Sequence, residues 1–242
     1  MTDMTGQTAL VTGAAGGIGA AIVRVLQSAG VTVAGADLRD STADFSITGD
    51  LMDPSFCENL PAQAVERMGR LDILVNNAGI ITRGKITEAS DADFARSMAI
   101  NVEAPFRLCR ASIPIMAGAG GGAIVNVASC WGVHPGPNHP VYVMSKAAVA
   151  SLTQCLGMDH AHQNIRVNAV CPNEVNTPMI RTGFVTRGLD PDSAIADLNA
   201  SVPLGRIAEP EDIADVVLFL ASDQARYLCG ALIEANGGKP VQ

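Results

Sequence analysis

The sequence lacks the residue patterns that usually bind metals or form disulfides. Its six cysteines include no Cys-x-x-Cys pair, and its four histidines form no His-Glu-x-x-His pattern. The sequence therefore indicates no metal site. Most of the cysteines lie in apolar segments, so we expect buried, reduced thiols in a cytoplasmic protein.

Basic clusters and long apolar runs are also missing. The net charge is −8 without any Lys/Arg cluster, which argues against a nucleic-acid surface, an anionic membrane or an acidic protein partner. Residues 1–4 carry no basic charge and no apolar run is long enough to span a membrane, so we expect neither a signal peptide nor a transmembrane helix. The chain has 242 residues, 48% of them hydrophobic, and no repeat or linker. We therefore expect one α/β domain over 1–242.

A glycine-rich turn follows the first expected strand, at 8–12, and leads into a helical pattern at 20–29. Gly13 would permit a tight turn, Gly17 a close backbone approach, and Gly19 close packing of the helix on the strand. Free N–H groups at the helix start would face a pyrophosphate. Such a turn can be only a tight connection, but with both flanking elements it predicts a dinucleotide site.

An acidic residue ends the second expected strand, at 31–36. Asp37 lies 37 − 17 = 20 residues after Gly17, where a carboxylate can accept hydrogen bonds from the adenosine ribose. It would repel a 2′-phosphate, which favours NAD over NADP. Arg39 weakens that preference, and Asp37 could instead merely begin a loop. The crossover at 38–49 is short, so we expect a loop there, with Asp50 and Leu51 ending the third strand near the adenine.

Polar and turn-forming residues end the strands expected at 71–75 and 123–128. The carboxyl ends of strands line the ligand site of an open α/β sheet, so we expect Asn77 and Ser129 there. Asn101 lies in an apolar part of the helical run 90–116. A mid-helix asparagine is unfavourable, so it either faces water or has a role, and its apolar neighbours favour a role.

The rest of the chain completes an alternating pattern. Helices are expected at 55–68 and 210–221, and strands at 166–171 and 232–235. The segment 179–203 is polar and irregular, so we expect the region 178–205 to be a substrate lid rather than regular structure.

A Tyr142-x-x-x-Lys146 pattern opens a helical run that follows Pro140 and continues to Ala161. Residues four apart share one face of a helix, so the phenol and the ammonium would lie close together. A phenol has a pKa near 10, and a neighbouring cation lowers it, which would make Tyr142 a usable base. The pattern is short and common, and taken alone it is better explained by an ordinary half-buried tyrosine and a solvated lysine.

Together, these motifs resemble the short-chain dehydrogenase/reductase family over nearly the whole chain. Ser129 and Tyr142 are 142 − 129 = 13 residues apart, the family's usual separation. The resemblance implies an α/β, doubly wound Rossmann-type fold with a seven-stranded parallel sheet and helices on both faces. Asn173 and Asn236 depart from the family, which commonly has glycine and aspartate there. The motifs are Thr12-Gly13…Gly17-Ile18-Gly19, Asn76-Asn77-Ala78-Gly79, Asn101, Ser129, Tyr142…Lys146, and Pro172 with Thr177.

The resemblance also implies roles for the side chains. Tyr142 would exchange a proton with the substrate oxygen, and Lys146 would lower its pKa and hold the nicotinamide ribose. Ser129 would hydrogen-bond the substrate oxygen, and Asn101 would hold a water that links Lys146 to solvent. The residues expected to bind the cofactor are Gly13, Gly17, Ile18, Gly19, Asp37, Asp50, Leu51, Asn77, Ala78, Gly79, Tyr142, Lys146, Pro172, Val175 and Thr177.

We therefore expect an NAD-dependent enzyme that interconverts a secondary alcohol and a ketone. The loops near the nicotinamide are rich in polar side chains, which favours a small polar substrate such as a polyol, a sugar or a hydroxy acid. His134, Asn138 and Arg181 are further polar candidates, and the large apolar groups are mainly Trp131 and Met179. The residues expected around the substrate are Ser129, Trp131, His139, Asn173, Glu174 and Met179.

Two other functions are open. A 3-oxoacyl reductase acting on acyl-carrier-protein or CoA thioesters would prefer NADP and a basic docking patch, which Asp37 and the acidic composition disfavour. A non-catalytic NAD-sensing module would not need the full set of catalytic side chains. The resemblance, together with the apolar runs 94–115 and 147–156, predicts a homotetramer.

Overall fold

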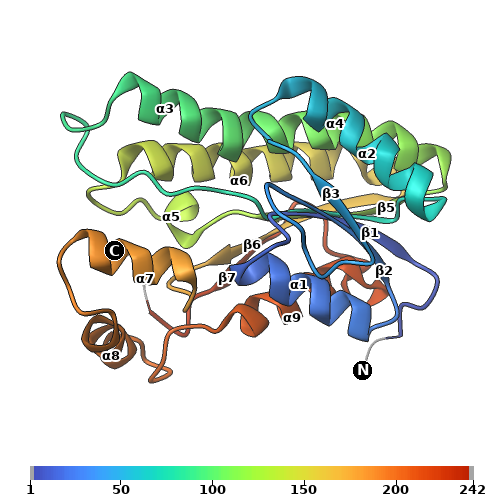
Figure 1. Cartoon of the computed structure of the whole chain (residues 1–242). Coiled ribbons are helices and arrows are strands. Elements are labelled where there is room, and N and C mark those ends of the chain that lie inside the picture. Colours follow the sequence, from blue (N-terminus) through green and yellow to red (C-terminus); the bar gives the residue numbers. More distant parts are fainter. Residues whose placement is uncertain (1–2, 240–242) are drawn as a thin grey trace.

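Seven parallel strands form one sheet in the computed structural model, which describes residues 3–239 (Figure 1). Their order is β3-β2-β1-β4-β5-β6-β7, with every neighbouring pair parallel. This confirms the expected doubly wound architecture. The strands are β1 (Thr8–Thr12), β2 (Thr32–Asp37), β3 (Phe45–Thr48), β4 (Ile73–Asn76), β5 (Gly122–Val127), β6 (Ile165–Pro172) and β7 (Leu232–Ala235).

Helices cover both faces of the sheet. Figure 1 shows α1 and α9 on one face and α2, α4 and α6 on the other, while α7 and α8 lie beyond the end of β6. The helices are α1 (Gly17–Ser28), α2 (Pro54–Met68), α3 (Asp91–Met98), α4 (Ala104–Gly118), α5 (Cys130–Val133), α6 (Pro140–His160), α7 (Pro178–Thr186), α8 (Pro191–Ser201) and α9 (Pro210–Ala221). A π-helical turn, Ala99–Glu103, joins α3 to α4, and short 3₁₀ turns lie at Ala161–Gln163 and Asp223–Ala225.

Two apolar cores form because successive strand residues point to opposite faces. Val11 packs with Ile22 of α1 and Val217 of α9, whereas Leu10, the next residue along β1, packs with Leu60 of α2 on the other side. All five residues of β1 are buried. A parallel strand buried on both faces is apolar in its interior, as Ala9 to Val11 are, and each large side chain contributes about 1.5–3 kcal/mol when fully buried.

The third strand ends earlier than expected. β3 stops at Thr48, and the Asp50 carboxylate accepts a hydrogen bond from the Met52 N–H at 2.9 Å, which fixes a turn before α2. As expected, the crossover at 38–49 contains no helix. Asp50 and Leu51 therefore belong to the turn that leads into α2, and not to the end of the strand.

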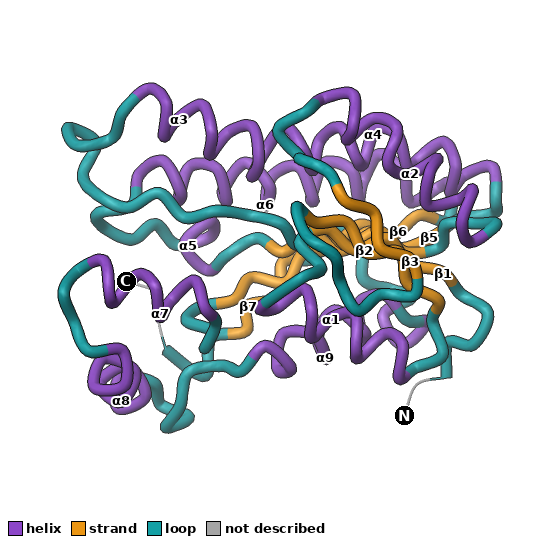
Figure 2. Tube along the Cα trace, in the orientation of Figure 1, coloured by secondary structure: helices purple, strands orange, loops and turns teal. Residues whose placement is uncertain are grey.

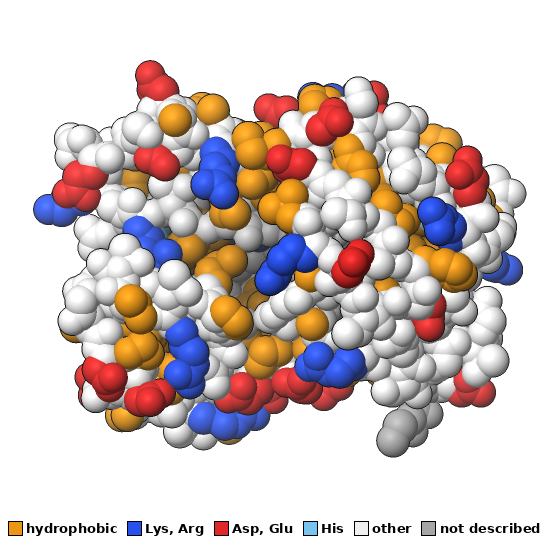
Figure 3. Space-filling model, in the orientation of Figure 1, with side chains coloured by type: hydrophobic (Ala, Val, Ile, Leu, Met, Phe, Trp, Pro, Cys, Tyr) orange, Lys and Arg blue, Asp and Glu red, His pale blue; other side chains and the backbone are white. Residues whose placement is uncertain are grey.

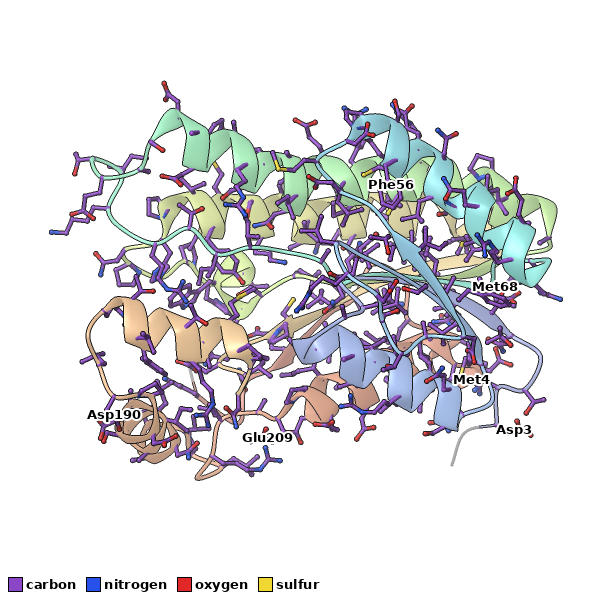
Figure 4. All side chains as sticks on the ribbon, viewed as in Figure 1. Asp3, Met4, Phe56, Met68, Asp190 and Glu209 are labelled. Atoms are coloured by element: carbon purple, nitrogen blue, oxygen red, sulfur yellow. The ribbon has the colours of Figure 1, made fainter. Side chains whose placement is uncertain are left out.

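The segment expected to be irregular contains two helices. Each begins with a proline, and the Asp190 carboxylate accepts a hydrogen bond from the Ser193 N–H at 2.9 Å at the start of α8. Figure 4 labels Asp190 there and Glu209 close to the start of α9. Phe184 and Ile195 join α7 and α8 through a small apolar cluster of their own. The segment is polar in composition, but its few apolar side chains are enough to pack the two helices together, so the expectation of irregular structure is wrong.

The order of the sheet determines where a ligand can bind. The chain leaves β1 toward β2 on one side and resumes at β4 on the other, so the carboxyl ends of these neighbours diverge into separate loops. Open α/β sheets bind ligands at this kind of switch point. Figure 2 shows the long loop between β4 and α3, residues 77–90, running past α5 and α6.

The thiols and the helices test two further expectations. All six cysteines are free, but Cys155 and Cys229 are exposed, so only four of them match the expectation of buried thiols. Among the helices within residues 3–239, none combines the length and apolar character that crossing a membrane requires.

Candidate active site

A cavity of about 630 Å³ lies where the carboxyl ends of the central strands meet the following loops. Figure 3 shows a hollow near the middle of this face, with Lys and Arg side chains beside it. The glycine turn after β1 forms one end of the cavity, and α6, α7 and the loops after β4 to β6 form the other.

The glycine turn leaves its backbone open toward the cavity. Gly13 and Gly17 have φ values of 66° and 52°, which strongly favour glycine. A Cβ on Gly13 would lie 2.9 Å from the Ala78 Cα, and one on Gly19 would overlap the Gly13 carbonyl oxygen. Gly16 precedes α1 without a side-chain cap, so the first N–H groups of the helix can bind an anion. These features fit the pyrophosphate of a dinucleotide.

A hydroxyl connects the ends of β1 and β4. Thr12 Oγ1 accepts hydrogen bonds from the Asn77 and Ala78 N–H groups, both at 3.1 Å. The Asn77 amide donates in return to the Thr12 and Gly13 carbonyl oxygens at 2.9 and 3.2 Å. The backbone of Asn77, Ala78 and Gly79 is thereby held along the cavity wall.

One acidic and one basic residue line the cavity near the glycine turn. The Asp37 carboxylate lines the cavity and accepts a hydrogen bond from the Ala15 N–H at 3.0 Å. Arg39 lines the same end, and its guanidinium Nη2 lies 3.7 Å from the position of a Cβ on Gly16. Both signs of charge are therefore present at this end of the cavity.

Lys146 is a buried cation at the base of the cavity. Its side chain is 5% exposed, and Nζ donates a hydrogen bond to the Val127 carbonyl oxygen at 2.7 Å. Burial lowers the pKa of Lys146 from 10.5 to about 8, because the charged form loses hydration. The ammonium is held by the end of β5, where it can reach a ligand in the cavity.

Tyr142 and Ser129 both line the cavity. The Ser129 hydroxyl lowers the pKa of the Tyr142 phenol, but burial has the larger effect and raises it. The expectation of a lowered pKa is therefore wrong for this arrangement. Lys146 Nζ donates to the Val127 carbonyl and lies 6.0 Å from the centroid of the Tyr142 ring, so the two side chains share one face of α6.

Asn101 lies behind the cavity, within the π-helical turn. Its Oδ1 accepts a hydrogen bond from the Ile80 N–H at 2.8 Å, and its Nδ2 donates to the Ile80 carbonyl at 2.9 Å and to Ser145 Oγ at 2.9 Å. Ser145 Oγ donates to the Tyr142 carbonyl oxygen at 2.7 Å. Asn101 therefore connects the loop after β4 to the helix that carries Tyr142 and Lys146. The π turn explains how an asparagine in a helical run contacts backbone rather than water.

The six residues expected around the substrate all line the cavity: Ser129, Trp131, His139, Asn173, Glu174 and Met179. The Trp131 ring lies 4.6 Å from that of His139 and 6.4 Å from that of Tyr142, between centroids. Glu174 is less available to a substrate than expected, because its Oε1 accepts a hydrogen bond from Lys239 Nζ at 2.8 Å.

Three further polar candidates do not line the cavity. Arg181 is exposed and pairs with Asp192 at 3.0 Å, on the outer side of α7. His134 pairs with Glu234 at 3.0 Å. Asn138 adopts a left-handed backbone conformation with φ 62°, in a loop where its carbonyl accepts a hydrogen bond from the Gly84 N–H. Arg181 and His134 therefore form ion pairs outside the cavity, and Asn138 contributes to the structure of its loop through its backbone.

Most of the expected cofactor residues line the cavity, but Gly19, Asp50 and Leu51 do not. Gly19 is the close helix–strand contact described above. Asp50 and Leu51 lie beyond the short edge strand β3, where Asp50 stabilises a turn and the Leu51 carbonyl accepts a hydrogen bond from Cys57 Sγ. The early end of β3 keeps both residues away from the cavity.

The structure adds residues that sequence reasoning missed. Arg83, in the loop after β4, was detectable in principle because that loop follows a strand at the switch point. Arg187 and the apolar side chains of α7 and α8 could not be recognised from the sequence as lining residues, because this segment was expected to be irregular. The expectation that Trp131 and Met179 are the main large apolar groups is wrong. The additional apolar lining residues on the substrate side are Ile81, Ile180, Phe184 and Leu198.

Comparison with known proteins agrees with this geometry. A family described as Enoyl-(Acyl carrier protein) reductase matches residues 13–239. An uncharacterized oxidoreductase of Thermotoga maritima is 35% identical over 98% of this chain and 98% of its own. The chain belongs to the short-chain dehydrogenase/reductase family.

Other members of the short-chain dehydrogenase/reductase family differ in their named substrates. A trans-4-hydroxycyclohexanecarboxylate dehydrogenase of Sinomonas cyclohexanicum is 36% identical, over 96% of this chain and 92% of its own. A 3-oxoacyl-(acyl-carrier-protein) reductase of Thermotoga maritima is 33% identical, over 97% and 98%. The family membership therefore establishes an oxidoreductase and leaves several substrate classes open.

Solved structures show the same fold over the whole chain. The ligand-free aldohexose dehydrogenase of Thermoplasma acidophilum has a TM-score of 0.92 at 30% identity, covering 100% of this chain and 95% of its own. A candidate NAD(P)-dependent gluconate 5-dehydrogenase of Beutenbergia cavernae has a TM-score of 0.89 at 33% identity, covering 98% and 97%, and its structure holds NADP.

Proposed function

We propose that this protein is a dehydrogenase that interconverts a secondary alcohol and a ketone, with NAD as the preferred cofactor. The observation that carries the proposal is the convergence of Ser129, Tyr142 and Lys146 on one cavity, whose other end is a glycine turn open to a pyrophosphate. When bound there, NAD would accept the hydride released by the alcohol carbon. The side chains of the protein would handle the proton and the substrate oxygen.

Tyr142 would take the proton of the substrate hydroxyl during oxidation and return it during reduction. Ser129 would hydrogen-bond the substrate oxygen, because it lines the same cavity as Tyr142. Because burial raises the pKa of Tyr142, the protonated phenol is favoured, and it is the form that donates to a ketone. Oxidation needs the deprotonated form, so its rate should increase with pH while that of reduction falls.

Lys146 and Asn101 would support this chemistry in different ways. Lys146 lines the cavity, where its three donors suit a ribose hydroxyl. Asn101 would act as a positioning residue, because it contacts the Ile80 backbone and Ser145 instead of lining the cavity. A water held between Asn101 and Lys146 remains part of the proposal: a Cβ on Gly79 would lie 3.3 Å from both Asn101 Oδ1 and Lys146 Nζ.

The preference for NAD depends on Asp37. Its carboxylate is held at the adenosine end by the Ala15 N–H, where a 2′-phosphate would meet a negative charge. Arg39 acts in the opposite direction, and the related structure from Beutenbergia cavernae holds NADP. We propose that Asp37 outweighs Arg39 because the Asp37 carboxylate is fixed by a hydrogen bond at the end of β2.

The substrate would be a small hydroxylated molecule held between Tyr142 and the helices α7 and α8. The named activities of the relatives, on an aldohexose and on a hydroxycyclohexanecarboxylate, support such a substrate. We propose that residues 178–205 cover it as a lid built from two helices. The whole chain, 1–242, would act as one catalytic domain and assemble as a homotetramer.

A 3-oxoacyl reductase is the second candidate, favoured by the acyl-carrier-protein reductase among the relatives. Such an enzyme docks an acidic partner, and a net charge of −8 opposes that association. Assays of hydride transfer with secondary alcohols, polyols and a 3-oxoacyl thioester, each with NAD and NADP, would separate the two candidates.

Tyr142→Phe tests the catalytic proposal directly. It removes only the phenolic hydroxyl, so we expect turnover to fall by about 10²–10⁴ while NAD binding stays close to normal. Lys146→Ala should reduce both, since Lys146 would contact the ribose. Near-normal turnover by the Phe variant would show that Tyr142 is not the proton donor. If the wild-type protein turned over no alcohol or ketone, a non-catalytic NAD-sensing module would be favoured.

A further inference from the structure

Arg83 is a cation without an anionic partner beside the reacting groups. It is half-buried in the loop after β4 and lines the cavity close enough to Tyr142 for the two to interact electrostatically. Within residues 3–239, its guanidinium makes no hydrogen bond and no ion pair. An arginine that loses hydration without gaining an acceptor is unfavourable, which suggests that its partner is a ligand.

Arg187 approaches the same place from the end of α7. Its Cζ lies 4.9 Å from the centroid of the Phe184 ring, and its Nε donates to the Gly183 carbonyl at 3.0 Å, which orients the guanidinium. The terminal amino groups have no acceptor among the described residues. Arg187, like Arg83, lines the cavity.

Gly183 is the point at which the two guanidinium groups converge. The carbonyl of Gly183 binds Arg187, while a Cβ on Gly183 would lie 2.8 Å from the Arg83 Cζ. Burial lowers the pKa of Arg83, and the positive charge of Arg187 lowers it further. Two cations that repel each other therefore share one wall of the cavity.

The acidic residues of the cavity do not compensate these charges. The carboxylates among its lining residues are Asp37 and Glu174. Asp37 lies at the adenosine end, bound to the Ala15 N–H, and Glu174 is paired with Lys239. An anion placed between Arg83 and Arg187 would remove their repulsion, and the planar fork of arginine matches a carboxylate.

We propose that the substrate is a hydroxy acid whose carboxylate is bound by Arg83 and Arg187 while its hydroxyl carbon faces Ser129 and Tyr142. This inference rests on the proposed dehydrogenase function and narrows its substrate class. The apolar side chains of Ile81, Ile180 and Leu198 line the same cavity and suit the carbon skeleton between the two polar ends.

The test compares substrates that share a hydroxylated skeleton and differ in whether they carry a carboxylate. One pair is gluconate and glucitol, and the other is 4-hydroxycyclohexanecarboxylate and its carboxamide. We expect the wild-type enzyme to have a higher kcat/KM for the acid of a pair. In Arg83→Gln and in Arg187→Gln, kcat/KM for the acid should fall by about 10- to 100-fold, the usual effect of losing one charge-assisted hydrogen bond, while that for the neutral partner stays unchanged.

Arg181→Gln is the matched control. It removes an arginine of α7, close to Arg187 in the sequence, whose side chain pairs with Asp192 and does not line the cavity. The acid-to-neutral ratio should stay at its wild-type value. Binding of NADH should also be unchanged in Arg83→Gln, because the glycine turn and Lys146, which would hold the cofactor, are left intact. Weaker NADH binding with an unchanged ratio would assign Arg83 to the cofactor and overturn the inference.

Calorimetry separates this inference from the proposed function. Each acid is titrated into the wild-type protein and the Arg83→Gln variant in the presence of NADH, without turnover. If an acid binds the wild type and binds the variant more weakly, the carboxylate site is supported. If in addition no alcohol is oxidised, only the dehydrogenase proposal is refuted. Oxidation of the neutral partners with no binding of either acid would refute the carboxylate site and leave the dehydrogenase intact.

Discussion

Lys146 should make the stability of the folded protein depend on pH in the alkaline range. Burial lowers its pKa from 10.5 to about 8. Below pH 8 both the folded and the unfolded states carry the proton, and the full cost of burying the charge opposes folding. Between pH 8 and 10.5 the folded state releases the proton while the unfolded state keeps it, so stability increases with pH.

The shift sets the size of this effect. A lowering from 10.5 to about 8 corresponds to about 3 kcal/mol of differential stability, at about 1.4 kcal/mol for each pKa unit. By pH 9.5, about 2 kcal/mol of it should be visible. Lys146→Met removes the titrating group and also the hydrogen bond to the Val127 carbonyl, but the loss of that bond alters the variant's stability by an amount that does not depend on the titration.

The assay is urea unfolding of the wild-type protein and Lys146→Met at several values between pH 7 and 9.5. The wild type should become more stable relative to the variant by about 2 kcal/mol over this range, because the contributions of all other groups cancel in the difference. Lys85→Met, on an exposed loop, is the control for removing any lysine. If the difference in stability between the wild type and Lys146→Met stays constant with pH, burial does not lower the pKa of Lys146, and the reasoning is refuted.

Three other outcomes follow from the same structure. Asp37→Ser should shift the NADP-to-NAD ratio of kcat/KM by at least about tenfold, equivalent to about 1.4 kcal/mol of lost repulsion, and a wild type that already prefers NADP would contradict the role of Asp37. Asp72→Asn should destabilise the fold by about 1–3 kcal/mol, because the buried Asp72 carboxylate accepts from the Thr8 N–H at 2.9 Å; urea unfolding measures this, with the exposed Asp192→Asn as control. Light scattering at micromolar concentration should give a tetramer, since Phe94 and Met158 remain 44% and 74% exposed, and a monomer would contradict the assembly.

The elements of the fold could be predicted because their signals are local. The strand at 8–12, the glycine turn and the helix that follows are recognisable from apolar pattern and backbone freedom, and these depend on a few neighbouring residues. The helix of Tyr142 and Lys146 was predicted for the same reason. The boundaries were less accurate where an element is short, as for β3, because a turn such as the one at Asp50 competes with the strand end.

The sequence alone determined which reactive side chains the protein has and the order in which strands deliver them. The spacing of Ser129, Tyr142 and Lys146 follows from one strand end and one helix face, so it was readable without coordinates. The tertiary structure decided their states and their neighbours. Burial of Tyr142 and Lys146, the pairing of Glu174 with Lys239, and the convergence of Arg83 and Arg187 at Gly183 join segments far apart in the chain, and their electrostatic effect depends on distances and solvent exclusion that no local pattern contains.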